Sequence, residues 1–418
     1  MTTSTPSRAR SSSPAGPPPA TAGPVRHGVG FWAVAGAFLV AMAFSTVPTP
    51  LYPLYEVRDG FSTFMVTVVF AVYSVGVMVS LVLAGHVSDW VGRRRILVAA
   101  LALELVAAVL FLSSAALPML LVARFVTGLG VGMLTATATA HLHELHAAHR
   151  PGASAQRFEV VSTAANIGGL GLGPLVAGFL AQYAGAPLRV PYAVFVALLV
   201  LVMAALALAP ETVRRPEARP RYRPQRVSAD HGDRAGYIAA AAAAFASFAV
   251  FGLFTSIAAG FVGHTLGHPS RGLAGGIVFA VFGGAALAQT LTHRLTPRAK
   301  MTAGLLAEGA GFLTLVVGMH TVDLAAFLAG GVVAGVGAGL LFKAAVGRVV
   351  AMAAPARRSE ALASLFLVAY LGLSVPAVAI GVATLSLTAT AAMTWFAGLL
   401  LVLLLVVAVL DRRSPGGR

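Results

Sequence analysis

Four charged side chains lie inside runs that are otherwise almost wholly apolar, and three of them, Glu104, Arg124 and Glu308, lie away from the cytoplasmic ends. A charge in apolar surroundings is costly and needs a partner, a wet cavity or a chemical role. A carboxyl group kept from water prefers its neutral form, so either acid is a candidate proton carrier. We expect Glu104 to pair with Arg124, whereas Glu308 has no evident cation. The alternatives are structural: an arginine that braces helices through backbone carbonyls, and acids that are merely shielded.

A second cluster of charge occupies the segment Gly85-His86-Val87-Ser88-Asp89-Trp90-Val91-Gly92-Arg93-Arg94-Arg95. Glycines let helix ends approach closely, and a carboxylate there can meet arginines or the positive N-terminus of a facing helix. Such contacts can tie two helical bundles together on one side. The candidate gating residues are Gly85, Asp89, Gly92, Arg93 and Arg94. An ordinary basic loop is the plain alternative.

Glycines also recur at helical spacing in two apolar runs. Gly128 and Gly132 share one helical face with the arginine at position 124. In the following run, Gly169, Gly173 and Gly178 leave one side nearly bare, and Pro174 removes a backbone donor and bends the helix. Bare helix faces predict close helix packing.

The elements that must position these residues are membrane-spanning helices. Of the 418 residues, 58% are hydrophobic and only 10% are charged, whereas a soluble chain has roughly a quarter charged. A span needs about 20 apolar residues. Twelve such runs fall at about 31–52, 63–84, 96–112, 117–140, 160–183, 190–209, 237–262, 273–291, 301–319, 324–345, 361–385 and 390–410.

Three stretches lack an apolar run. Residues 1–30 are rich in Ser, Pro, Ala and Arg and predict a disordered tail. Residues 211–235 are charged and Pro-rich and predict a hydrated linker, and residues 411–418 form a short second tail. The linker divides the chain into a first six-helix bundle, residues 31–210, and a second, residues 236–410.

The distribution of basic residues predicts the orientation. Nearly all of the 29 Lys and Arg residues fall in the tails and the even-numbered loops, and only Arg58, Arg189 and Arg271 fall in the odd-numbered loops. The positive-inside rule therefore predicts that both tails, the linker and the charged loop are cytoplasmic. The net charge of +15 then reflects topology, and we expect no binding of nucleic acid.

The two halves of the sequence also contain similar glycine patterns in the same order. Residues 128–132 (GLGVG) correspond to 335–339 (GVGAG), and residues 170–174 correspond to 371–376. Matched order in both halves predicts two pseudo-symmetric six-helix bundles.

These motifs resemble those of the major facilitator superfamily of secondary transporters. The family's charged loop has the spacing found from Gly85 to Arg95, although Trp90 stands where the family usually has a basic residue. The segment from Arg124 to Gly132 resembles the family's second motif. The pattern from Asn166 to Gly178 is similar to the motif of the drug/proton antiporters, with Ala177 in place of a glycine. The proline-rich segment from Val47 to Tyr55 resembles the same twelve-span efflux branch.

This resemblance implies an all-α fold in which every third helix lies outside a central cavity. The spans of Glu104 and Glu308 belong to that outer set, so a structural role for both acids remains open. The lining spans contain no acid at mid-membrane depth, and a mixed aromatic and hydroxyl lining suits a neutral or anionic amphiphile. The residues expected to line the cavity are Phe44, Ser45, Thr46, Thr49, Tyr52, Tyr73, Ser74, Asn166, Phe251, Phe254, Thr255, Gln289, Tyr370 and Ser374.

Two further groups of residues carry weaker patterns. The histidines His141, His143, His146 and His149 predict a solvated cluster at the membrane interface, with pH sensing or weak metal binding as the alternative. Lys343 is expected to reach cytoplasmic water without any part in the cavity.

The sequence therefore predicts a secondary active transporter of the bacterial plasma membrane that exchanges a small amphiphilic solute for protons during efflux. It predicts no enzyme and no metal site, since the spans hold no convergent Ser/His/Asp or two-His set and the chain has no cysteine, and it predicts no cofactor. An ion gradient is the expected energy source, because no phosphate-binding loop is present to use ATP. The expected partners are the solute, protons and the lipid bilayer, and the chain is expected to act as a monomer. The alternatives are a proton-linked importer of a sugar or organic acid, and a membrane sensor that does not transport.

Overall fold

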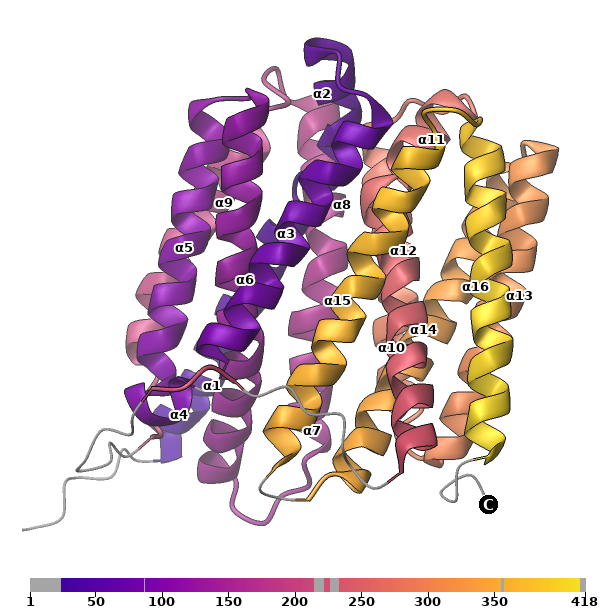
Figure 1. Ribbon diagram of the computed structural model, residues 1–418. Coiled ribbons are helices and arrows are strands. Elements are labelled where there is room, and N and C mark those ends of the chain that lie inside the picture. Colours follow the sequence, from indigo (N-terminus) through magenta and orange to yellow (C-terminus); the bar gives the residue numbers. More distant parts are fainter. Residues whose placement is uncertain (1–23, 86, 214–221, 226–232, 355–356, 414–418) are drawn as a thin grey trace, which may run out of the picture.

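The apolar runs of the sequence become long helices in this computed structural model, which describes residues 24–85, 87–213, 222–225, 233–354 and 357–413 (Figure 1). Within these ranges the structure has helices and no strands. Twelve helical segments are long and apolar enough to cross a membrane. The predicted all-α fold is confirmed.

Six spans form the first half of the molecule. The first span comprises α1 (Pro24–Thr46), η1 (Thr49–Leu51) and α2 (Tyr52–Asp59), and the second is α3 (Thr63–Ala84). The short α4 (Ser88–Val91) precedes the third span, α5 (Arg93–Ser113), and the fourth is α6 (Leu117–His149). The fifth span comprises α7 (Gln156–Thr163), the π-helical turn η2 (Ala164–Gly168) and α8 (Gly169–Tyr183), and the sixth comprises α9 (Val190–Ala205) and η3 (Leu206–Leu208).

Six spans form the second half. Their elements are α10 (Arg234–Ser256) with the short α11 (Ala258–His264), α12 (Arg271–Leu291), α13 (Pro297–Thr321), α14 (Leu324–Met352), α15 (Arg358–Ala383) and α16 (Ala389–Arg413).

The starts of several spans follow from local capping chemistry. The first N–H groups of a helix have no partner within it, and a short polar side chain just before the helix can accept from them. Ser62, Ser270 and Thr296 do so for α3, α12 and α13, and Asp233 and Asp323 do so for α10 and α14, at distances between 2.8 and 3.3 Å.

Several helices are longer than their apolar runs. Helix α1 begins at Pro24 and α6 continues to His149, beyond the predicted ends near residues 31 and 140. A helix ends where its backbone hydrogen bonds end, whereas an apolar run ends at the edge of the hydrocarbon. The extra turns therefore carry polar side chains, including the histidines of α6, out of the apolar layer.

The first half lies on one side of the molecule and the second half on the other (Figure 1). Helix α8 packs against α12, and α3 packs against α15, and these two helix pairs form the most extensive contacts between the halves. The outer spans α9 and α16 are only 33% buried over their most apolar windows, whereas α10 is 72% buried. This agrees with the expectation that every third helix, which includes the sixth and twelfth spans, lies outside the central cavity.

Helix α1 begins and α16 ends on the same side of the molecule, which we name the terminal side (Figure 1). The opposite side, which holds α2 and α11, is named the far side.

Candidate functional site

A cavity of about 890 Å³ lies between the two halves of the molecule. Its lining extends from Asp89 and Ser359, on the terminal side, to Thr49 and Thr255, toward the far side. On the far side the halves are in direct contact. There the Arg271 backbone N–H of α12 donates to Gln182 Oε1 at 3.0 Å, and its side chain donates to the Ala181 carbonyl at 2.9 Å. The cavity is therefore closed toward the far side and extends to the terminal side.

The two walls of the cavity differ in chemistry. The first half contributes most of the polar lining, which comprises Ser45, Thr46, Thr49, Tyr73, Arg124, Thr135, Thr139 and Asn166. The second half contributes a cluster of aromatic rings around Phe248, which lies 5.0 Å from Phe342 and 5.4 Å from Tyr370 between ring centroids. Phe251 stacks on Phe282 at 4.5 Å in the same wall. A solute in this space meets a polar face on one side and an aromatic face on the other.

Most of the predicted lining residues lie where the sequence placed them. Those found in the cavity wall are Ser45, Thr46, Thr49, Tyr73, Asn166, Phe251, Thr255, Gln289 and Tyr370.

Phe44, Tyr52, Ser74, Phe254 and Ser374 do not line the cavity, and this part of the prediction is wrong. Adjacent residues on a helix point about 100° apart, so a neighbour of a lining residue turns into the bundle. The Phe44 ring accordingly packs on Phe111 and Phe195, and the Phe254 ring packs on Phe327.

Arg124 lies in the cavity wall on α6, with only 2% of its surface exposed. It donates from Nη1 to the Ser45 carbonyl of α1 at 2.7 Å, and its guanidinium lies 4.4 Å from the centroid of the Tyr73 ring on α3. Its Nε has no hydrogen-bond partner within the described residues. The expected ion pair with Glu104 is not formed in this structure.

The two buried acids occupy matching places in the two halves. Glu104 on α5 and Glu308 on α13 are both fully buried, so neither faces lipid, and neither lines the cavity. A Cβ atom on Gly130 of α6 would lie 2.6 Å from Glu104 Oε1, and one on Gly337 of α14 would lie 2.6 Å from Glu308 Cα. Within the described residues, the carboxyl oxygens of both acids lack hydrogen-bond partners.

Arg124 and Glu104 do not form the expected ion pair because their side chains extend in different directions. Arg124 extends toward α1 and α3, where the Ser45 carbonyl and the Tyr73 ring hold it. Glu104 instead lies beside the small residue Gly130, which leaves room for a carboxyl group between α5 and α6. Sequence spacing placed both residues on neighbouring helices but did not determine which side each faces.

The charged loop between α3 and α5 is organised around Arg93. Its guanidinium contacts Ser88 Oγ at 2.7 Å, Asp89 Oδ1 at 2.5 Å and Glu144 Oε1 of α6 at 3.0 Å. Glu211 accepts from the backbone N–H groups of Arg93 and Arg94, at 2.8 and 3.2 Å.

All of these partners belong to the first half or to the segment that follows it, so the described residues of the loop do not tie the two halves together in this structure. Gly92 has a φ of 116°, and a Cβ atom there would lie 2.5 Å from Glu211 Oε2. Gly85 caps the end of α3, with its N–H donating to the Leu81 carbonyl at 3.3 Å.

The predicted packing glycines lie at helix contacts. Gly128 and Gly132 face α3, where a Cβ atom on each would meet the backbone of Gly76 and the side chain of Ser80. Gly169 and Gly173 face α1, where they approach Met42 and Ala43.

Gly178 and Pro174 face α12 of the other half. A Cβ atom on Gly178 would meet the Arg271 carbonyl, and one on Gly275 would meet the Pro174 carbonyl. The glycine and proline pattern of α8 thus forms part of the contact that closes the far side.

Two expectations at the terminal side need correction. His141 and His146 are almost fully buried and not solvated. Nε2 of His141 lies 3.0 Å from the Pro210 carbonyl oxygen, and Nε2 of His146 lies 3.1 Å from the Ser154 carbonyl oxygen, so protein groups replace water around both rings.

Lys343 lines the cavity, where its Nζ donates to the Gln289 carbonyl at 2.7 Å. The part of the chain that the structure describes holds no group of His, Cys, Asp or Glu suited to a metal.

Sequence reasoning missed three features of this site. Glu144 and Glu211 hold the charged loop, but neither belongs to the motif itself. Lys343 lies 3.8 Å from Glu159 of α7, the one ion pair between the halves among the described residues. Asn166 lies in the π-helical turn η2, a distortion that often marks functional sites.

Comparisons with known proteins agree with this geometry. The model of the Major Facilitator Superfamily matches residues 33–322. Two uncharacterized MFS-type transporters of Mycobacterium tuberculosis are 31% identical over 160 residues, which is 38% of this chain and 23% of theirs, and 29% identical over 156 residues, 37% and 26%. The chain thus spans about a quarter of the length of these curated relatives.

Solved structures share the fold. The human organic anion transporter MFSD10 is 17% identical, with a TM-score of 0.64 over 91% of this chain and 99% of its own. A peptide transporter, POT, in complex with sulfate is 15% identical, with a TM-score of 0.74 over 92% of this chain and 94% of its own. A mutant of that transporter in complex with alafosfalin has a TM-score of 0.73 at the same identity and coverage. A family model that covers most of its length, together with twelve spans in two halves around a central cavity, shows that the chain belongs to the Major Facilitator Superfamily.

Proposed function

We propose that the protein exports a small amphiphilic solute in exchange for protons by alternating access. The observation that carries this proposal is the cavity with one polar and one aromatic wall, closed on the far side and extending to the terminal side. Such a space takes up a solute from one face of the membrane and releases it to the other once the halves rock about it.

The lining favours a neutral or anionic solute over a multivalent cation. Arg124 is the charged residue deep in the cavity, and the carboxylates of the lining, Asp89, Glu144 and Glu159, lie at its terminal side. A buried guanidinium attracts carboxylate or phosphate groups and repels cations. The aromatic wall around Phe248 would take the apolar part of the solute.

Coupling to protons is supported by the two buried acids. Glu104 and Glu308 lie in low-dielectric surroundings without hydrogen-bond partners among the described residues, where a carboxyl group is most easily kept neutral. Each is a candidate to gain or lose a proton when helices α5 and α6, or α13 and α14, shift against each other.

Direction and topology belong to the same proposal. The resemblance of α8 and of the proline-rich segment after α1 to the efflux branch favours export, with the terminal side in the cytoplasm of a bacterial cell and the chain acting as a monomer. The halves, residues 31–210 and 236–410, would move as two bodies about the linker 211–235. The charged loop around Asp89 and Arg93 would meet the second half only when the terminal side closes.

The test is transport by the purified protein in liposomes with an imposed pH gradient, screened with neutral, anionic and cationic amphiphiles. Export by antiport predicts that solute moves against the proton flow and that dissipating the gradient stops it. Glu104→Gln and Glu308→Gln should uncouple transport from the gradient, whereas Glu360→Gln, outside the cavity lining, should not. Efflux of multivalent cations would contradict the proposed solute class.

The same assay separates the alternatives. Proton-linked import of a sugar or organic acid predicts that solute and protons move in the same direction, with alkalinisation of the medium. A membrane sensor predicts binding of a solute without accumulation under any gradient.

A further inference from the structure

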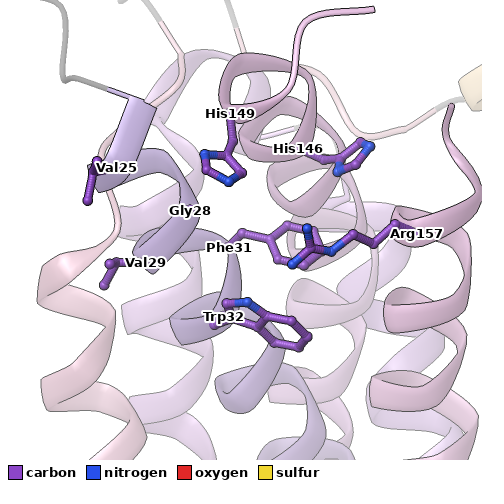
Figure 2. Close-up of a pocket in the computed structure, with 8 residues that line it drawn as sticks. All are labelled: Val25, Gly28, Val29, Phe31, Trp32, His146, His149 and Arg157. Atoms are coloured by element: carbon purple, nitrogen blue, oxygen red, sulfur yellow. The ribbon is translucent and has the colours of Figure 1, made fainter. Parts of the chain in front are cut away.

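A second hollow, of about 290 Å³, lies at the terminal-side ends of α1, α6 and α7 and is separate from the central cavity (Figure 2). Its walls come from the first turns of α1, the end of α6 and the start of α7. The residues that line it are Val25, Gly28, Val29, Phe31, Trp32, His146, His149 and Arg157.

Arg157 is the fixed positive charge of this hollow. Its guanidinium carbon lies 5.8 Å from the centroid of the Phe31 ring and 5.5 Å from that of the Trp32 ring (Figure 2). A cation–π contact uses none of the guanidinium N–H groups in a hydrogen bond, so these groups stay available to an anion. Among the described residues Arg157 has no ion pair, and the lining contains no carboxylate.

One wall of the hollow faces outward from the bundle. Val25, Val29 and Trp32 are 76%, 46% and 55% exposed, and their spacing places them along one side of the first turns of α1. This is the level at which α1 leaves the apolar layer, where tryptophan is common at the membrane interface. An anion bound here would therefore carry an apolar part that lies against these three side chains.

We propose that this hollow binds the headgroup phosphate of an anionic phospholipid in the terminal-side leaflet. Arg157 donates to the phosphate oxygens, with the histidine rings of α6 beside it, and Trp32, Val25 and Val29 contact the glycerol and upper acyl chains. The apolar exposed wall favours a lipid over free phosphate, because a soluble anion leaves that wall in contact with water.

Trp32 is a built-in reporter of this site. Trp90→Phe and Trp395→Phe leave it as the single tryptophan, since the chain has three. The variant is reconstituted in phosphatidylcholine vesicles with increasing fractions of phosphatidylglycerol brominated in its upper acyl chain, and quenching of Trp32 gives the relative affinity for the anionic lipid. An interfacial arginine contributes about 1 kcal/mol to binding of anionic lipid, so Arg157→Gln should lower that preference about five-fold.

Matched controls make the result specific to the hollow. Arg95→Gln removes a positive charge from an exposed position in the first turn of α5 and should leave the preference unchanged. Arg157→Lys keeps the charge but loses the planar guanidinium with its several N–H donors, and should give an intermediate preference. Equal quenching in Arg157→Gln and Arg95→Gln would overturn the proposal. Relief of quenching by millimolar inorganic phosphate would also overturn it, in favour of a soluble anion.

Discussion

At the scale of single residues, the buried acids and the glycines that face them repeat in both halves. Gly130 and Gly337 are the central residues of the two matching glycine segments, and each faces the acid on the preceding span. The match between residues 128–132 and residues 335–339 therefore reflects a shared packing arrangement, in which a glycine on one helix makes room for a glutamate on another.

This arrangement predicts unequal effects of adding a methyl group. A Cβ atom at position 337 would meet the backbone of Glu308, which cannot move without shifting α13, whereas at position 130 the closest atom belongs to the end of the Glu104 side chain. Gly337→Ala should therefore cost about 1–3 kcal/mol through overpacking, and Gly130→Ala less. Apparent melting temperatures in detergent should fall further for Gly337→Ala.

A double variant tests the physical reason. Glu104→Ala shortens the side chain that faces position 130, so Gly130→Ala should cost less in that background than alone. No such relief is expected for Gly337→Ala combined with Glu308→Ala, because the backbone contact remains. Equal melting temperatures for the two single glycine variants would contradict this account.

Arg124 makes a second prediction at this scale. Its hydrogen bond to the Ser45 carbonyl and its stacking on Tyr73 depend on a planar guanidinium. Arg124→Lys should reduce solute transport by about ten-fold, since a hydrogen bond of a charged group contributes about 1.5–3 kcal/mol. Arg124→Gln should reduce it further for anionic solutes than for neutral ones. Initial rates of uptake into liposomes check both, and unchanged rates for Arg124→Lys would show that the stacked geometry is not needed.

At the scale of helices, the sequence predicted the number and order of the spans well, because a run of about 20 apolar residues has few alternatives to crossing the bilayer. It predicted less well where helices end and which way they face. Nothing in the apolar runs marks α1 beginning at Pro24, or Phe44 turning away from the cavity while Ser45 lines it. Rotation about a helix axis is set by packing against neighbours, and that information lies in residues far away in the chain.

The partners of the charged loop show the same limit. Asp89 and Arg93 could be recognised from their spacing, but Glu144 and Glu211 could not, because they lie about 50 and 120 residues beyond the loop and belong to no local motif. A contact between helices that are distant in sequence leaves no trace in local spacing.

The contact between α8 and α12 is expected to control how often the far side of the cavity opens. A Cβ atom on Gly178 would collide with the Arg271 carbonyl, whereas one on Gly168 would meet nothing within 4 Å. Gly178→Ala should thus destabilise the far-side contact and shift the population toward the far-side-open state by roughly ten-fold, if overpacking costs about 1–3 kcal/mol. Gly168→Ala is the matched control on the same span.

The absence of cysteine from the chain makes this shift measurable. Thr49→Cys places a single thiol deep in the cavity lining, and a membrane-impermeant maleimide applied to the far side reports how often it is reached. Labelling should be faster in Gly178→Ala than in Gly168→Ala. Identical labelling rates in the two variants would show that the α8 contact does not control the far side.

At the scale of the whole molecule, the terminal side of the cavity is bridged by the ion pair between Glu159 of the first half and Lys343 of the second, 3.8 Å apart. Their side chains are 52% and 26% exposed, and ion pairs as accessible as this contribute only about 0.2–1 kcal/mol. Breaking the pair should change the balance of the two states about two-fold, far less than a packing defect on α8. The contacts that hold the halves in this state are therefore expected to lie on the far side.

A charge reversal tests this balance. Glu159→Lys alone places two cations together and should separate the halves at the terminal side, which speeds maleimide labelling of a Thr139→Cys reporter in the cavity lining about two-fold or more. The double variant Glu159→Lys with Lys343→Glu restores opposite charges and should return the rate to that of the parent, since the attraction depends on sign and distance alone. If the double variant labels as fast as the single one, the pair does not link the halves, and Lys343 is held by the Gln289 carbonyl alone.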